Sequence, residues 1–169
     1  MEKGLPDYLR NNLRILFIGY NPSIRSADSG HHYAGRNNRF WKLLFEAGLT
    51  PRLYCPEEDD KLLELGYGLT NIVARPTKAA GDLTAEDYKE GRKRLYNVLQ
   101  RYKPLIACYV GIGVYKEFAK NRKAVPGLQS NSVVRGVVDF AAPSSSGLNR
   151  MLFQDQLSYY KELYRLLNI

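Results

Sequence analysis

Short apolar runs that alternate with helix-like segments limit the folds open to this chain. The runs cover Leu13 to Gly19, Leu105 to Val110 and Val137 to Ala142, and they are rich in β-branched and other aliphatic residues. Apolar runs of this length are typical of strands buried on both faces of a parallel sheet. Strands that alternate with helices predict an α/β fold, with helices on both faces of a mostly parallel sheet of four or five strands.

The segments between these runs supply the other predicted elements. Gly68 to Val73 is expected to form a further strand, and Val133 to Ala142 a strand-like segment that Gly136 interrupts. Hydrophobic spacing and capping residues predict helices over residues 38–47, 57–65, 84–102, 114–120 and 156–167. Residues 21–36 are expected to form a long polar loop, and loops of this length are more often functional than idle. With no repeat or linker, residues 1–169 are expected to form a single domain.

Polar residues directly follow the first and the last of these runs. Gly19-Tyr20-Asn21-Pro22-Ser23 follows the first run, and Pro143 to Arg150 follows the last. Ligands of α/β sheets bind at the carboxyl ends of the strands. We therefore expect the two polar segments to form one cleft.

Asn21 is the residue of the first segment best suited to hold a small ligand. Pro22 restricts its backbone, and its carboxamide can accept one hydrogen bond and donate two. These properties suit a water molecule or the edge of a pyrimidine, but an amide cannot act as a general base at neutral pH. Asn-Pro dipeptides also start turns, and this alternative stays open.

Aromatic and histidine side chains in the long loop are further candidates. The ring of Tyr33 could stack on a base removed from its helix, although most of the 13 tyrosines are expected in the core or on the surface. His31 and His32 are expected to be bystanders, because exposed loop histidines without carboxylate partners seldom act as acids or metal ligands.

The second polar segment offers hydrogen-bond donors and an apolar tip. The three serines at 144–146 present hydroxyl and backbone N–H groups, and they would bind phosphate if they open the C-terminal helix. Leu148 follows Gly147, and insertion into a base stack would explain an exposed leucine at this flexible position. In the alternative interpretation, Leu148 and Met151 begin the buried face of the C-terminal helix.

The charge of the chain favours a polyanionic partner. The net charge is +8, and contacts between Lys or Arg and phosphate release condensed counterions. A soluble protein that happens to be basic is the alternative. The basic residues are spread along the chain, so a binding surface would have to be assembled by folding.

Other features argue against several classes of protein. Cys55 and Cys108 lie far apart and are expected to stay free. Together with His31 and His32 they supply too few ligands for a metal site, so none is expected. No segment approaches the ~18 uninterrupted apolar residues of a membrane span. The first residues lack the apolar core of a secretion signal, and the cytoplasm is the expected location.

The polar segments resemble the mismatch-specific uracil/thymine DNA glycosylase family, within the uracil-DNA glycosylase superfamily. Gly19 to Ser23 is similar to the family's Gly-Ile-Asn-Pro-Gly motif, and residues 38–42 match its Asn-Arg-Phe-Trp-Lys segment. Arg75-Pro76-Thr77 matches its Arg-Pro-Thr segment, and Pro143 to Arg150 resembles its second motif. The similarity follows the family's order over nearly the whole chain.

The resemblance implies a three-layer α/β/α sandwich with a short parallel sheet and a DNA repair enzyme. The reaction would be hydrolysis of the N-glycosidic bond of a flipped-out uracil in double-stranded DNA, which leaves an abasic site. No metal or organic cofactor is expected, and a monomer is expected because a base-flipping cleft needs one subunit. Without a general base the enzyme would be slow, and weakly paired bases such as uracil in G:U mismatches would be preferred.

The resemblance also implies roles for individual residues. Asn21 would position the attacking water. The base would be bound by Tyr20, Tyr33, Asn71 and Ser26, with Tyr33 stacking on it. Contacts to DNA and the wedge that fills the vacated space would come from Ser23, Ser144, Ser145, Ser146, Gly147, Leu148, Asn149 and Arg150. Tyr20 and Ser23 depart from the family's pattern, which has a small aliphatic residue and a glycine at these places.

Two other classes of function stay open. The same fold could hold damaged or single-stranded DNA without catalysis, because Ser23 adds bulk where the backbone comes close to the substrate. A nucleotide-processing enzyme could use Gly111-Ile112-Gly113 for phosphate, but this is a weak dinucleotide signal. Close packing at a strand-to-helix turn explains these glycines equally well. The chain also lacks a phosphate-binding lysine motif and a carboxylate cluster for a metal, which ranks this class last.

Overall fold

The predicted strands pair into one five-stranded sheet in the computed structural model, which describes residues 4–168. The strands are β1 (Ile15–Gly19), β2 (Tyr67–Asn71), β3 (Ile106–Val110), β4 (Gly127–Leu128) and β5 (Val138–Ala142). Their order is β2-β1-β3-β5-β4, and every neighbouring pair is parallel except β4 and β5. The strand from the first apolar run therefore lies inside the sheet, and the expected mostly parallel sheet is confirmed.

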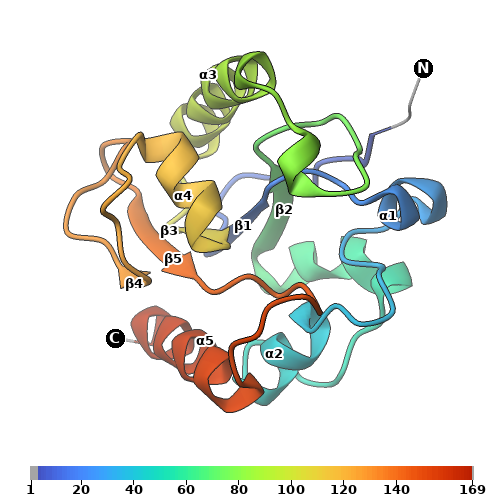
Figure 1. The fold of residues 1–169 in the computed structure, drawn as a ribbon. Coiled ribbons are helices and arrows are strands. Elements are labelled where there is room, and N and C mark those ends of the chain that lie inside the picture. The colour runs from blue at the N-terminus through green and yellow to red at the C-terminus, as the bar shows by residue number, and fades with distance from the viewer. Residues whose placement is uncertain (1–3, 169) are drawn as a thin grey trace.

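Helices cover both faces of this sheet (Figure 1). They are α1 (Ile24–Ser29), α2 (Phe40–Glu46), α3 (Ala85–Tyr102), α4 (Ile112–Ala119), α5 (Phe153–Leu167) and the 3₁₀ helices η1 (Pro56–Leu65) and η2 (Ala80–Asp82). Helices α2 and α5 pack on one face, whereas α3 and α4 pack on the other. The three-layer α/β/α arrangement is therefore confirmed.

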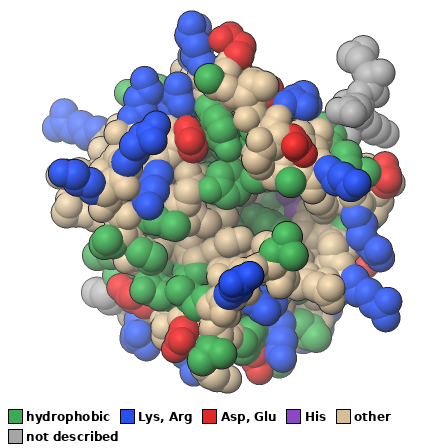
Figure 2. All heavy atoms as spheres, viewed as in Figure 1, with side chains coloured by type: hydrophobic (Ala, Val, Ile, Leu, Met, Phe, Trp, Pro, Cys, Tyr) green, Lys and Arg blue, Asp and Glu red, His purple; other side chains and the backbone are tan. Residues whose placement is uncertain are grey.

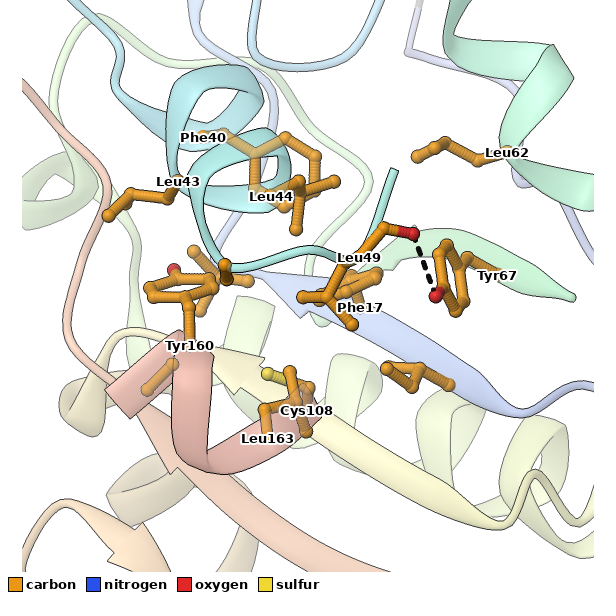
Figure 3. Packing of buried hydrophobic residues seen from close by; sticks show 14 of the residues in the cluster. Phe17, Phe40, Leu43, Leu44, Leu49, Leu62, Tyr67, Cys108, Tyr160 and Leu163 are labelled. Atoms are coloured by element: carbon orange, nitrogen blue, oxygen red, sulfur yellow. Dashed lines mark hydrogen bonds between the residues drawn. The ribbon is translucent and has the colours of Figure 1, made fainter. Parts of the chain in front are cut away.

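Alternate strand residues point to opposite faces and build a core on each side of the sheet. Phe17 and Cys108 belong to the core beside α2 and α5, and Leu16 and Tyr109 to the core beside α3 and α4. Figure 3 shows the first core, where Phe17 meets Phe40 edge to face with ring centroids 5.3 Å apart. Because both faces of β1 and β3 are covered, their residues are buried at every position, as their apolar sequences predict.

The N-terminal segment covers the free edge of β2. Tyr8 forms an antiparallel bridge with Leu69, with N···O distances of 2.9 and 3.0 Å. The Asp7 carboxylate accepts hydrogen bonds from Thr70 at 2.8 Å and from Arg94 at 2.9 Å. An edge strand exposes unpaired backbone groups, so these contacts protect the sheet from pairing with another chain.

The expectation of one long loop over residues 21–36 is wrong, because α1 lies within it. Ser23 Oγ accepts a hydrogen bond from the Ser26 N–H and caps the helix, and Gly30 ends it in the left-handed region at φ 78°. The helix has the sequence Ile-Arg-Ser-Ala-Asp-Ser, with no apolar stripe. Hydrophobic spacing therefore could not indicate it.

The C-terminal third also differs from the expectation. Within residues 133–142 only Val138–Ala142 forms a strand, and its partner β4, which has two residues, was not expected. Helix α5 begins at Phe153, three residues earlier than the periodicity indicated. A two-residue strand carries no pattern of its own, because pairing with β5 defines it.

Asp139 of β5 is a buried carboxylate in the sheet. It accepts hydrogen bonds from the Val133 N–H at 2.9 Å and from the Tyr109 hydroxyl at 3.2 Å. Burial raises its pKa from 3.8 to about 6, despite these hydrogen bonds, which lower it. The folded state therefore holds the proton more tightly than the unfolded chain, so this group favours folding below about pH 4 and loses that effect as the pH rises through about 6.

We expect the difference in unfolding free energy between the unmodified protein and the Asp139→Asn variant to depend on pH. The difference should fall by about 2 kcal/mol between pH 4 and pH 7, since one pKa unit corresponds to about 1.4 kcal/mol and the unfolded side chain is already partly ionised at pH 4. Urea denaturation at several pH values measures it. Asp28→Asn, at an exposed position of α1, is the control, and a pH-independent difference for Asp139→Asn would contradict the assignment.

Candidate active site

Both polar segments line one cleft at the carboxyl ends of the strands, as expected. Its walls include residues 19–23 after β1, Asn71 at the end of β2, Val110 at the end of β3 and residues 144–148 after β5. The cleft has a volume of about 450 Å³ and opens on the face shown in Figure 2, where the surface is hollowed near its centre. Parallel pairing brings the carboxyl ends of these strands to the same end of the sheet.

Hydrogen bonds fix the orientation of the Asn21 carboxamide. Its Nδ2 donates to the Arg75 carbonyl and to Thr77 Oγ1, each at 2.8 Å. Thr77 Oγ1 gives its own proton to the Ala79 carbonyl at 2.7 Å, so it can only accept from Asn21. Both N–H donors of Asn21 are therefore engaged, and no group of the described residues donates to its Oδ1. Because Asn21 lines the cleft, its Oδ1 is available there to accept a hydrogen bond from a ligand.

The Asn21-Pro22 dipeptide forms no turn of its own and leads directly into α1. Pro22 leads into Ser23, which caps α1, and the Pro22 carbonyl accepts from the Thr77 N–H at 3.2 Å. Ser23 and Thr77 form an isolated parallel bridge. The bridge and the hydrogen bonds of Asn21 therefore hold this segment against Arg75-Pro76-Thr77, and the two segments of the sequence pattern meet in one place.

Tyr33 and Asn71 meet at Gly19. The ring of Tyr33 stacks on Phe40 with centroids 3.9 Å apart, so one face is covered by the protein. Its hydroxyl is buried without a partner among the described residues, and burial raises its pKa far above the usual range. A Cβ atom on Gly19 would lie 2.6 Å from Asn71 Oδ1 and 3.1 Å from the Tyr33 hydroxyl. Glycine is therefore required where these two polar groups approach the strand.

Tyr20 also lines the cleft, and it explains the Gly-Ile-Gly segment. A Cβ atom on Gly113 would lie 1.5 Å from the Tyr20 hydroxyl, and one on Gly111 3.5 Å from its ring. Burial raises the pKa of Tyr20 to about 12, so the hydroxyl keeps its proton. Close packing of a tyrosine against the start of α4 thus accounts for the second glycine.

Ser26 is buried in α1 and supports the loop that carries Tyr33. Its Oγ accepts from the Ala34 N–H at 3.1 Å, and its carbonyl accepts from Gly30 and His31. It also lines the cleft, next to the exposed Ser23. Both serines therefore have hydrogen-bonding roles within the protein in addition to their place in the wall.

The expectation that His31 and His32 are exposed and without a carboxylate partner is wrong. His31 Nδ1 lies 3.1 Å from Asp59 Oδ1, and the His32 N–H donates to Asp59 Oδ2 at 2.8 Å. His32 is buried, which lowers its pKa, and its Nε2 lies 2.7 Å from the Pro6 carbonyl. Sequence spacing could not indicate these contacts, because Asp59 lies 27 residues further along the chain. They tie the Tyr33 loop to η1 and to the N-terminal segment.

The serines of the second segment do not open the C-terminal helix, which begins at Phe153. They close a tight loop instead. Ser144 Oγ accepts from the Ser146 N–H and Ser146 Oγ from the Leu148 N–H, each at 3.2 Å, whereas Ser145 is buried. The Asn149 side chain donates to the Ser144 carbonyl at 2.8 Å.

Leu148 is 92% exposed at the tip of this loop. The alternative that it begins the buried face of a helix is therefore wrong. Gly147 and Arg150, on either side of Leu148, are exposed as well, so the tip faces solvent. Leu148 lines the mouth of the cleft.

Several cleft residues were not predicted from the sequence. They include Leu5, Arg36, Asn37, Lys78 and Ala80. Lys78 directly follows the Arg75-Pro76-Thr77 segment, and this position could have indicated it. Leu5 carries no such signal, because the N-terminal segment reaches the cleft only through tertiary contacts. Arg36 and Lys78 are both exposed and place positive charge at the mouth.

Cysteine and acidic side chains do not gather in this cleft. Cys55 is exposed and Cys108 is buried, and both are free, as expected. Within residues 4–168, no three His, Cys, Asp or Glu side chains are grouped so that they could hold a metal ion. The same residues contain no helix with the length and apolar character that a bilayer crossing requires.

Two comparisons with known proteins bear on this cleft. A solution NMR structure of a protein from Methanosarcina acetivorans, described as a proposed uracil DNA glycosylase, has a TM-score of 0.69 and 22% sequence identity. That match covers 99% of each chain and shows a shared fold. The Uracil DNA glycosylase superfamily matches residues 6–168, which is nearly the whole chain. The chain therefore belongs to the uracil DNA glycosylase superfamily, a family of DNA glycosylases.

Proposed function

We propose that this protein hydrolyses the N-glycosidic bond of a flipped-out uracil in double-stranded DNA and leaves an abasic site. The observation that carries the proposal is the fixed carboxamide of Asn21 in the cleft. With both N–H donors engaged, its Oδ1 is an acceptor for a proton of the attacking water. A water held in this way directs a lone pair toward C1′ of the everted nucleotide.

The residues around the cleft favour bond cleavage ahead of attack. Among the described residues that line it there is no Asp or Glu, so no carboxylate is present to deprotonate the water. The bond to uracil then breaks substantially before water attacks, and the sugar gains oxocarbenium character. Backbone N–H groups around Tyr20 and Tyr33 would stabilise the leaving uracil anion, and DNA phosphates the sugar cation. Lacking a general base forgoes a factor of about 10²–10⁴, so the enzyme should be slow.

The walls of the cleft suit a flipped base. The free face of the Tyr33 ring would stack on uracil, and the Asn71 carboxamide would contact its polar edge. Leu148 would enter the space that the base leaves in the duplex. Arg36, Lys78 and Arg150 would contact phosphates.

The structure weakens the main argument for a DNA-binding module without catalysis. That argument rested on the bulk of Ser23 near the substrate. Ser23 Oγ accepts a hydrogen bond from the Ser26 N–H at 3.0 Å, so its side chain is held by α1. We therefore favour the enzyme, and the first experiment below separates the two.

Asn21→Ala should lower the single-turnover rate of uracil release by about 100-fold or more, because the water loses its acceptor. The dissociation constant for G:U duplex DNA should change little. Release from a labelled oligonucleotide and fluorescence anisotropy measure the two quantities. Asn97→Ala, an exposed position of α3, is the matched control. If the unmodified protein binds this DNA but releases no uracil, the binding-module alternative is correct.

Thr77→Val should lower the rate of release about tenfold without weakening DNA binding, because one hydrogen bond that orients Asn21 is lost. Valine matches threonine in shape but cannot accept from Asn21 Nδ2. Thr77→Ser keeps the hydroxyl and should restore most of the rate. A Val variant as fast as the unmodified protein would show that the Arg75 carbonyl alone orients the amide.

Uracil in a G:U mismatch should be released faster than uracil in an A:U pair, because the weaker pair is easier to open. Single-turnover rates for the two duplexes test this expectation. A panel with thymine, hypoxanthine and xanthine opposite each normal base would define the range of substrates. Equal rates for G:U and A:U would mean that extrusion does not limit release.

A further inference from the structure

The Asn38-Arg39-Phe40-Trp41-Lys42 segment has no role in the function proposed so far, although the sequence pattern singled it out. Its aromatic residues anchor it in the core. Phe40 is fully buried, and it lies under Tyr33 and edge to face with Trp41, with ring centroids 5.1 Å from Trp41. The segment therefore provides a rigid base at the start of α2, beside the cleft.

Arg39 connects this base to the loop that carries Leu148. Its backbone N–H donates to the Ser145 carbonyl at 2.8 Å, and its guanidinium Nη1 donates to the Asn149 carbonyl at 3.1 Å. The two bonds hold the loop on both sides of its tip. Asn149 in turn donates to the Ser144 carbonyl, which closes the loop.

The loop has few other ties to the protein. Among the described residues, the other hydrogen bonds of residues 144–149 join partners within residues 144–151. Asn37 packs under Gly147, where a Cβ atom would lie 2.7 Å from Asn37 Cβ and 2.8 Å from its carbonyl oxygen. Leu148 itself is too exposed to be held by packing. The stiffness of the tip therefore depends on Arg39 and on the contact with Asn37.

We propose that Arg39 is a positioning residue that holds Leu148 in place for insertion into the duplex. This inference rests on the proposed function. Arg39 does not line the cleft, so it contacts neither the base nor the water. Extruding a base from the duplex costs free energy, and a wedge side chain that moves during insertion cannot hold the base out. A residue of this kind matters for opening a duplex and is dispensable for the chemical step.

The guanidinium group suits this task better than an ammonium group. Its planar fork can reach a carbonyl along a fixed direction, and less freedom is lost in forming the bond. Lysine would keep the charge but not this geometry. We therefore expect the geometry of the guanidinium group at position 39 to matter, and not its charge alone. Arg39→Lys tests that distinction.

The experiment compares uracil release from a G:U duplex, an A:U duplex and a single strand under single-turnover conditions. Arg39→Met should lower the rate on the G:U duplex about tenfold, more on the A:U duplex, and hardly at all on the single strand. Arg39→Lys should change the three rates in the same way, and it replaces the Met variant if that variant does not fold. Arg135→Met, at an exposed position, is the matched control. Thermal unfolding of each variant is measured alongside the release rates to check that the variant is folded.

A double-mutant cycle adds a second readout. If Arg39 acts through Leu148, then Arg39→Met combined with Leu148→Ala should be no slower on the G:U duplex than Leu148→Ala alone. Additive losses, or equal losses on duplex and single strand, would overturn the inference and leave the proposed function intact. An unmodified protein that releases uracil from none of the three substrates would overturn the proposed function and this inference with it.

Discussion

The parallel register of β1 with its neighbours is the constraint on which the cleft depends. Gly19 pairs with Asn71 across β1 and β2, and both lie at the carboxyl ends of their strands. The same direction of pairing places the carboxyl ends of β3 and β5 at this end of the sheet. Because β1 and β3 are apolar and buried on both faces, a slip in register would also move large side chains between the two cores. The position of the cleft is therefore coupled to the packing of the whole domain.

Polar side chains at the cleft are held by hydrogen bonds more than by packing. The Asn21 amide is fixed by Arg75 and Thr77, and the tip that carries Leu148 is tied to Arg39. In each case the partner comes from a segment far along the chain, and the two segments meet only after folding. Such networks orient a functional group at the end of a strand while leaving its reactive face open to the substrate.

Much of the fold and part of the site followed from local sequence. The apolar runs indicated β1 and β3, which are apolar and buried throughout, and β5, whose run is interrupted by the buried Asp139. Helix α1 and the two-residue strand β4 were missed, since neither has a hydrophobic pattern. The contacts of His31 and His32 with Asp59 were missed for another reason, because they join segments that no short motif connects.

The sequence by itself determined which faces must be buried, where β1, β3 and β5 end, and that Asn21 and the serine-rich segment follow two of those ends. These properties are local, since they depend on the chemistry and spacing of neighbouring residues. Only the tertiary structure decided that Asn21 presents its oxygen, that Leu148 is exposed and that Tyr20 requires Gly113. An amide has no preferred direction until its partners are in place, and exposure depends on what the rest of the chain covers.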